Sequence, residues 1–197
     1  MKEIIKVEKE TNNKFLNLYH AYYKFSNDKI IDYQFSSRRS ENNLVINSKG
    51  DRKIDAVRIL PYYEKDGKIF VVFIKEFRMP LNKYIYSLPA GCVDFNEDAL
   101  ESAKRELSEE IGADVESIES MLENGYSSAG MTDENISSYI AKIKLNGEQH
   151  LEDTEDITIE IVELKDVINF INNNEFCLPS ALQAEVFYYK TLLEASK

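Results

Sequence analysis

Apolar and polar positions alternate along much of the chain after residue 55, which predicts a β-rich segment. Strands are predicted over residues 56–60, 68–74, 84–88, 137–143 and 157–162, and the Lys65-Asp66-Gly67 segment is predicted to turn between the first two. Helical periodicity instead predicts helices at about 94–112, 167–171 and 180–193. Strands mixed with a few helices favour an α/β (α+β) sandwich.

Residues 1–50 differ in pattern and are predicted to form a separate lobe, followed by one domain over residues 51–197. An aromatic-rich run spans residues 15–25, a turn is expected at residues 26–28, and a strand at 30–35. The polar stretch 40–51 is predicted to be a loop or hinge. Three roles stay open for the aromatic side chains: packing of a core, a dimer interface, or stacking against a ligand base.

The segment from Gly91 to Ala113 combines a helix signature with a high density of acidic residues. Asp94 or Asn96 is expected to cap the helix, with Glu97 as the capping-box partner of Asp94, and Gly112 to end it. On a helical wheel one apolar stripe is predicted to be buried. It comprises Ala99, Leu100, Ala103, Leu107 and Ile111.

Three carboxylates border this stripe: Glu106, Glu109 and Glu110. Glu106 and Glu110 lie four residues apart, so their charges repel each other, and Arg105 is expected to pair with Glu101 and Glu109 without neutralising the whole cluster. A solvated acidic helix face is one interpretation. The other is a site for Mg²⁺ or Mn²⁺, because these hard cations prefer carboxylate and water oxygens.

The order of the fixed positions favours the second interpretation. Gly91 is followed by five residues and Glu97, then by seven residues and the run Arg105-Glu106-Leu107-Ser108-Glu109-Glu110-Ile111-Gly112. This pattern resembles the Nudix box at every defining polar and glycine position, with Ala113 where a larger aliphatic residue is usual. The resemblance implies the Nudix fold, a mixed β-sheet between helices, here with a small N-terminal β-rich lobe.

Further segments resemble the ADP-ribose pyrophosphatase subgroup of that superfamily. They are Glu76-Phe77-Arg78 with Pro80, residues 87–91, residues 127–134 and the acidic stretch 152–157. The chain departs from the subgroup at Ala129, where proline is usual, and at Glu76, where glutamine is common. The resemblance implies hydrolysis of ADP-ribose to AMP and ribose 5-phosphate. The alternative substrates are another nucleotide sugar, a dinucleotide or an oxidised nucleotide. The alternative class of protein is a nucleotide sensor that does not hydrolyse its ligand.

The resemblance also implies roles for individual residues. The metal ligands would be the backbone carbonyl of Ala90 and the side chains of Glu106, Glu109, Glu110 and Glu155. Catalytic roles fall on Glu109, Arg105 and a loop carboxylate that accepts the proton of water, either Asp153 or Glu152. Substrate contacts would come from Arg78, Glu134, Met131, Ser128 and Arg38 of a partner's lobe, with Arg39 as an equal candidate to Arg38. The subgroup is a homodimer with exchanged N-terminal lobes.

Bulk properties exclude several other classes. A net charge of −11 over 197 residues argues against general binding of nucleic acid or anionic membranes. No run of 18 apolar residues indicates a membrane span, and the charged start of the chain is unlike a signal peptide. Two cysteines are too few for a disulfide framework. A cytoplasmic location is therefore expected.

Overall fold

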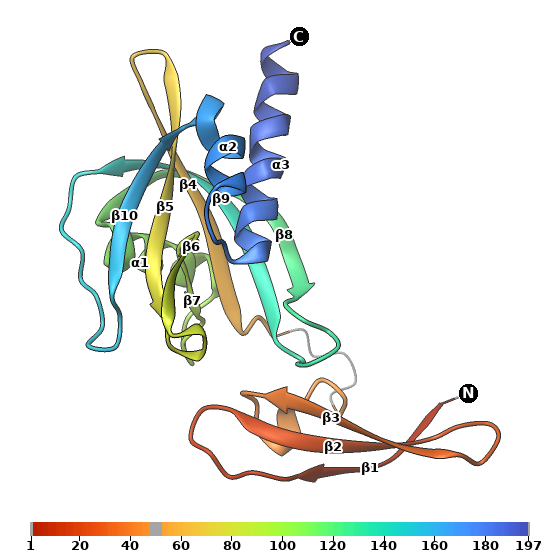
Figure 1. Cartoon of the computed structure of the whole chain (residues 1–197). Coiled ribbons are helices and arrows are strands. Elements are labelled where there is room, and N and C mark those ends of the chain that lie inside the picture. Colours follow the sequence, from red (N-terminus) through yellow and green to blue (C-terminus); the bar gives the residue numbers. More distant parts are fainter. Residues whose placement is uncertain (1, 48–52, 197) are drawn as a thin grey trace. The chain divides into compact units, whose positions relative to one another are not determined.

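The computed structural model describes residues 2–47 and 53–196 of the chain. Its contacts divide the chain into two compact units (Figure 1). The first unit joins Met1–Asp55 to Asn124–Ile136, and the second joins Ala56–Glu123 to Ser137–Lys197. The first unit therefore contains the expected N-terminal lobe together with a later segment, which connects two strands of the second unit.

The first unit is built on an antiparallel sheet in the order β1-β2-β3. Its strands are β1 (Glu3–Lys9), β2 (Asn17–Lys24) and β3 (Ile30–Ser37), and a 3₁₀ helix, η1 (Glu41–Asn43), follows. The predicted strand at 30–35 is confirmed by β3, and the predicted turn by Asp28, whose φ is 60°. The aromatic run lies mostly on β2.

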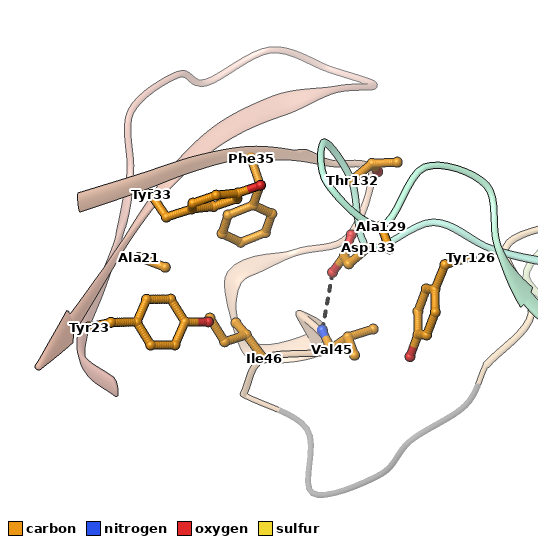
Figure 2. Close-up of a pocket in the computed structure, with 10 residues that line it drawn as sticks. All are labelled: Ala21, Tyr23, Tyr33, Phe35, Val45, Ile46, Tyr126, Ala129, Thr132 and Asp133. Carbon is orange, nitrogen blue, oxygen red and sulfur yellow. Dashed lines mark hydrogen bonds between the residues drawn. The ribbon is translucent and has the colours of Figure 1, made fainter. Parts of the chain in front are cut away.

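Part of this aromatic run packs a small core. Tyr19 is fully buried, its ring stacks on that of Phe35 with 5.6 Å between centroids, and its hydroxyl donates to the carbonyl of Arg39. Other aromatic rings of the unit line a cavity of about 290 Å³ (Figure 2). Its lining comes from the sheet, from residues 45–46 and from the later segment, and includes Tyr23, Tyr33, Phe35, Tyr126 and Ala129.

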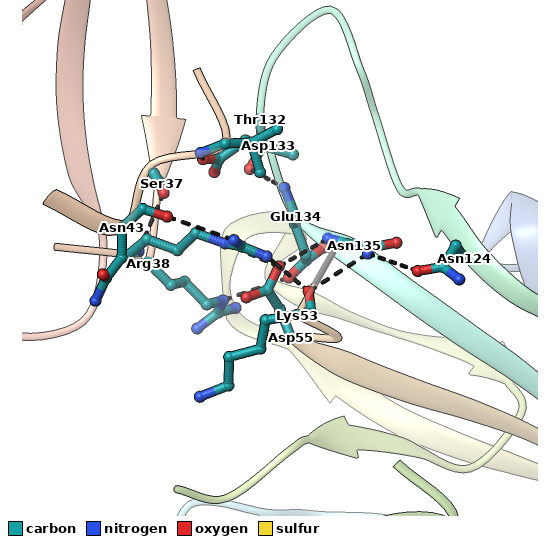
Figure 3. Close-up of polar contacts among 12 residues, drawn as sticks. Ser37, Arg38, Asn43, Lys53, Asp55, Asn124, Thr132, Asp133, Glu134 and Asn135 are labelled. Atoms are coloured by element: carbon teal, nitrogen blue, oxygen red, sulfur yellow. Dashed lines mark hydrogen bonds and ion pairs between the residues drawn. The ribbon is translucent and has the colours of Figure 1, made fainter. Parts of the chain in front are cut away.

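A buried ion pair ties the later segment to the lobe (Figure 3). The guanidinium of Arg39 contacts Asp55 at 2.8 Å, with only 7% and 13% of the two side chains exposed, and also donates to the Lys53 carbonyl at 2.7 Å. The same Asp55 oxygen accepts the backbone N–H of Asn135 at 2.9 Å, and the Asn135 amide donates to Asn124. Both ends of the later segment are thereby fixed within the first unit.

We expect Arg39→Met to destabilise the first unit by about 3–5 kcal/mol, because the Asp55 carboxylate would lose its ion-pair partner in a largely buried site. This loss is measured by chemical denaturation, with hydrogen exchange of the backbone amides of the first unit as the readout. Arg38→Met is the matched control, since half of the Arg38 side chain is exposed. Equal stability of the two variants would show that the buried pair is not a stabilising contact.

The second unit contains a sheet in the order β10-β5-β4-β9-β8, with β6 beside β5 and β7 beside β4. The strands are β4 (Ala56–Lys65), β5 (Lys68–Arg78), β6 (Lys83–Ser87), β7 (Ala90–Cys92), β8 (Ala113–Tyr126), β9 (Asn135–Leu145) and β10 (Ile157–Glu163). The helices are α1 (Ala99–Ile111), α2 (Val167–Asn172) and α3 (Leu178–Ala195), with 3₁₀ turns η2 (Met79–Leu81) and η3 (Leu164–Asp166). All five strands and all three helices predicted after residue 55 are confirmed.

Alternation along β5 explains the sandwich. Val71 and Phe73 belong to one core cluster, which includes α2 and α3 residues, whereas Val72 and Ile74 belong to another, which includes Leu107 of α1. Because successive strand residues point to opposite faces, α1 covers one face and α2 and α3 cover the other (Figure 1). No helix among the described residues is long and apolar enough to cross a membrane.

Two details of α1 correct the sequence expectation. The cap is Asp98, whose carboxylate accepts the N–H groups of Leu100 and Glu101, while the Glu101 carboxylate accepts the N–H of Asp98. Asp94, Asn96 and Glu97 do not form this capping box. Leu100 is 38% exposed and lies outside the buried stripe, because the later start places it in the first, solvent-facing turn. Gly112 ends the helix as predicted, with φ of 60°.

Candidate active site

One arginine organises the acidic face of α1. Arg105 Nη1 donates to Glu106 at 2.7 Å and to Glu109 at 2.9 Å, and its Nε contacts both oxygens of Glu97 at 3.2 Å. The pairing expected with Glu109 is confirmed. The one expected with Glu101 is wrong, because Glu101 is engaged in the helix cap.

The contacts of Arg105 with Glu97 and Glu106 were not predicted from the sequence, and neither were two others. Arg105 Nη2 donates to the backbone carbonyl of Cys92 on β7, and Ser102 donates to Glu97 at 2.6 Å from a fully buried position. The hydrogen bonds from Arg105 and Ser102 lower the pKa of the Glu97 carboxyl. Glu97 therefore stays charged and holds the arginine fork in place.

The next two carboxylates are nearly withdrawn from solvent. Glu106 and Glu110 are 6% and 3% exposed, although both are acidic. Burial raises the pKa of Glu106, against the opposing charge of Arg105. Burial, and then the charges of Glu106, Glu155 and Glu76, raise the pKa of Glu110 well above its ordinary value. A solvated acidic helix face, one of the two interpretations of the sequence, is therefore excluded for Glu106 and Glu110.

β7 closes the site from the other side. The backbone N–H of Ala90 donates to Glu110 at 3.2 Å, and a Cβ at position 91 would overlap the Glu106 carboxylate. Only glycine allows the strand to approach this side chain so closely. The glycine that opens the motif is therefore required by its contact with Glu106 of the same motif.

We expect Gly91→Ala to lower the affinity for a divalent cation or the turnover by about 10–100-fold, because the methyl group would displace the Glu106 carboxylate. Binding of Mn²⁺ followed by electron paramagnetic resonance tests this directly. Cys92→Ala is the control, since it changes the next side chain and keeps the carbonyl that Arg105 contacts. If Gly91→Ala bound the cation as tightly as the wild type, the position of the Glu106 carboxylate would not matter for cation binding.

The late acidic loop brings one further carboxylate to the group. β10 pairs with β5 in a register that places Ile157 opposite Glu76, so the residues before Ile157 reach the same end of the sheet. The Glu155 carboxylate accepts the backbone N–H of Glu152 at 2.9 Å, and its charge raises the pKa of Glu106 and Glu110. Glu152 and Asp153, the two candidates for the base, are exposed.

Arg78 is connected to this carboxylate group through Glu76. Its guanidinium contacts Glu76 at 2.7 Å, and 40% of the side chain is exposed. Burial raises the pKa of Glu76, the charge of Arg78 opposes this rise, and Glu155 adds to it. Glu76, which the sequence marked only as a departure from the subgroup, is thus part of the group. Glu76 lies near the end of β5, and its partial burial gives no separate signal in the sequence.

The remaining predicted substrate residues belong to the first unit. Arg38 contacts Glu134 of the same chain at 3.4 Å, so these two candidates lie side by side (Figure 3). Met131 is 69% exposed and its carbonyl accepts the Ser36 N–H, while the Ser128 carbonyl accepts the N–H of Met131. Arg39 is not an equal candidate to Arg38: its guanidinium is buried against Asp55.

Comparison with known proteins decides the family. The NUDIX domain matches residues 52–179, which is well over half of the chain. The chain belongs to the Nudix family. The Nudix fold, a sheet between helices, is likewise confirmed: a crystal structure of an ADP compounds hydrolase aligns with a TM-score of 0.74 and 16% identity, covering 99% of this chain and 95% of that one.

Several Nudix relatives carry a more specific name. An ADP-ribose pyrophosphatase of Bacillus subtilis is 30% identical over 135 residues, 67% of this chain and 71% of that protein. One of Saccharomyces cerevisiae is 30% identical over 164 residues, 79% of this chain and 68% of that protein. The alignment with a Nudix hydrolase of Caenorhabditis elegans, 30% identical over 127 residues, spans 60% of this chain and only 56% of that relative. The predicted resemblance to the ADP-ribose pyrophosphatase subgroup is supported by these names.

Proposed function

We propose that the chain is a metal-dependent hydrolase that cleaves the pyrophosphate bond of a nucleoside diphosphate derivative, with ADP-ribose giving AMP and ribose 5-phosphate. One observation carries this proposal. A single guanidinium holds Glu97, Glu106 and Glu109 together beside the buried Glu110. A family member that only binds nucleotides would have no need to keep Glu106 and Glu110 buried at the expense of their charge.

The donor set fits a hard divalent cation. No cluster of three or more His, Cys, Asp or Glu side chains within residues 2–47 and 53–196 is already arranged as a metal site. The charges of Glu106 and Glu155 nevertheless raise the pKa of Glu110, as neighbouring carboxylates do when no cation lies between them. Mg²⁺ or Mn²⁺, which prefer oxygen ligands, would relieve this repulsion.

In the bound state we assign five ligands. They are the side chains of Glu106, Glu109, Glu110 and Glu155 and the backbone carbonyl of Ala90. The cation would screen the anionic pyrophosphate and acidify a water molecule. Arg105 is a positioning residue in this scheme, because its guanidinium contacts Glu106 and Glu109, two of the assigned ligands.

Hydrolysis adds the oxygen of water to one phosphorus and breaks the bridging bond from that phosphorus to oxygen. The proton of the water must pass to a nearby base. Asp153 and Glu152 are exposed on the loop that also carries Glu155, so either carboxylate is free to take this proton without losing a structural contact. The Glu152 backbone, and not its side chain, positions Glu155.

Substrate contacts are proposed for both units. Arg78 would turn from Glu76 to a phosphate, for which its guanidinium offers two parallel donors. Glu134 would accept the hydroxyls of the terminal ribose, with Ser128 and Met131 from the same loop. Arg38 would contact phosphate in a homodimer whose N-terminal lobes exchange. We also propose that the enzyme acts in the cytoplasm.

A second substrate remains a specific candidate because of Ala129. This residue lines the aromatic cavity of the first unit, at the position where the subgroup usually has proline. Proline would fix the backbone φ angle of the loop, whereas alanine leaves it free. Another ADP-linked compound is therefore the alternative substrate to ADP-ribose.

The experiment is a hydrolysis panel at fixed Mg²⁺ or Mn²⁺, with ADP-ribose, a nucleotide sugar, a dinucleotide and an oxidised nucleoside triphosphate as substrates. Products are identified by mass spectrometry, so that AMP and ribose 5-phosphate are seen separately. We expect the highest kcat/KM for ADP-ribose. A higher value for another compound would make that compound the assigned substrate. If none of the compounds were hydrolysed although they bound, a nucleotide sensor would be favoured.

A further inference from the structure

The connection between β9 and β10, residues 146–156, carries Glu155 together with both candidates for the base (Figure 1). The structure describes all of these residues, and none of them lies in a helix or a strand. A surface connection of this kind is ordinarily more mobile than the elements that it joins. A carboxylate on it would lose conformational freedom each time it bound a cation, unless other contacts already held the connection in place. Such contacts lie at both of its ends.

The first end of the connection lies on the C-terminus of α1. The last turn of a helix leaves carbonyl groups without partners inside the helix. The side-chain amide of Gln149 donates to the Glu110 carbonyl at 2.6 Å, and the His150 N–H donates to the Glu109 carbonyl at 2.8 Å. Leu151, the next residue, packs against the core cluster that α1 helps to form. The connection therefore holds the backbone of the two residues whose carboxylates we assign to the cation.

The second end lies on β5 and β6. The Asp156 carbonyl accepts the Phe77 N–H at 3.2 Å, and the Asp156 carboxylate accepts the hydroxyl of Tyr84. Phe77 and Tyr84 are paired across the two strands, and their rings pack edge to face with 5.2 Å between centroids. The Tyr84 ring is therefore supported from below, and its hydroxyl reaches the residue directly after Glu155.

Glu155 is tied to this second end by a local turn. Its carboxylate accepts the Glu152 N–H at 2.9 Å, and its own N–H donates to the Glu152 carbonyl at 2.9 Å. Glu155 therefore moves together with Asp156. In the absence of a cation its charge is repelled by Glu106 and Glu110, so repulsion would move Glu155 away from α1 if the ends of the connection were released.

We propose that Tyr84 and Gln149 are positioning residues for the cation site. Gln149 fastens the connection to α1, Tyr84 fastens it to the sheet, and together they keep Glu155 beside the carboxylates of α1 before a cation is bound. This inference rests on the proposed function, which makes Glu155 a ligand. Neither side chain touches the cation or the substrate in this scheme. The advantage is preorganisation, because a ligand that is already in place does not have to be ordered on binding.

Two substitutions test these roles. Tyr84→Phe keeps the ring that packs on Phe77 and removes only the hydroxyl, and Gln149→Ala removes the amide. We expect each to weaken Mn²⁺ binding, followed by electron paramagnetic resonance, by about 10-fold. The Mg²⁺ concentration for half-maximal hydrolysis should rise to the same extent, with kcat recovered at high Mg²⁺, because the cation then draws Glu155 into place. A general weakening of the fold would instead lower kcat at every Mg²⁺ concentration.

The matched controls lie on the helices that cover the opposite face of the sheet. Asn173→Ala also removes a side-chain amide that donates to a carbonyl in the last turn of a helix, that of Asn169 at 2.8 Å. Tyr189→Phe removes the hydroxyl of a tyrosine on α3 that is 54% exposed, compared with 42% for Tyr84. Both controls should bind Mn²⁺ as tightly as the wild type. Equal weakening in the controls would overturn the assignment of Tyr84 and Gln149.

Hydrogen exchange of the metal-free protein tests the fastening without any hydrolysis. Tyr84→Phe should speed exchange of the Glu152 and Phe77 amides by about 5-fold, and Gln149→Ala should do so for the His150 amide, as expected for the loss of one hydrogen bond. Unchanged exchange in both variants, or faster exchange with wild-type affinity for Mn²⁺, would overturn the proposal. A wild type that neither binds Mn²⁺ nor turns over substrate would reject the proposed function itself, and the exchange rates would still decide whether the two side chains fasten the connection.

Discussion

Glu110→Gln should lower kcat by about 10²–10⁴-fold, because it would remove one of the proposed anionic ligands of a cation that we expect to supply several kcal/mol of transition-state stabilisation. The same change should raise the thermal stability of the metal-free protein. Glu110 is 3% exposed and lies near the charges of Glu106, Glu155 and Glu76. Replacing a buried, repelled carboxylate by a neutral amide should stabilise the fold by about 1–2 kcal/mol, or about 2–8 °C.

The two readouts are measured separately, kcat with saturating Mg²⁺ and the melting temperature with chelator. The amide oxygen of Gln can still accept the N–H of Ala90, so the backbone contact is kept. Glu101→Gln on the same helix is the control, and it should leave kcat unchanged while weakening the helix cap. Loss of activity together with loss of stability in Glu110→Gln would point to a structural role instead.

Arg105→Lys should reduce kcat/KM by about 10–100-fold, even though the charge is preserved. Arg105 contacts Glu97, Glu106, Glu109 and the Cys92 carbonyl through three different nitrogens. A lysine ammonium is a single point on a flexible chain and cannot span these acceptors. The carboxylates would lose their fixed spacing, so we expect the apparent affinity for Mg²⁺ to fall as well.

The neighbouring residue provides a matched comparison. Lys104 is exposed on the same turn of α1, and Lys104→Met should leave the magnesium dependence unchanged. Arg105→Met should be less active than Arg105→Lys, since it removes the charge as well as the fork. If Arg105→Lys kept the activity and the magnesium affinity of the wild type, Arg105 would act as a counter-ion only and not as a positioning residue.

Most elements of the second unit were predicted from the sequence because their periodicity is regular: Val71 to Ile74, for example, alternate between two cores. Gly112 ends α1 as the sequence predicts, but the cap was misassigned because Asp94 and Asp98 are both followed by a glutamate three residues later. β8 was not predicted, because its solvent-facing glutamates and glycine interrupt the alternation over Ala113–Tyr126. The strand is held instead by pairing with its neighbour β9, which the sequence does not show.

The candidate site divides in the same way. Spacing on one helix brings Glu106, Glu109 and Glu110 together, so the sequence alone indicates them. Glu76 joins the group through strand pairing, and Ser102 and the Cys92 carbonyl join it through contacts between segments. Arg38 and Arg39 are adjacent in sequence, yet one contacts Glu134 at the surface and the other is buried against Asp55. The two arginines differ in burial, and no local sequence pattern indicates which of them is buried.

The most direct test of the proposed metal-dependent hydrolysis is release of AMP from ADP-ribose by the wild-type chain, measured as Mg²⁺ is titrated from zero and then removed with chelator. We expect no release without the cation, release that saturates with it, and reversal on chelation. Release that is equally fast in chelator would contradict it, because the buried carboxylates would then have no cation to hold.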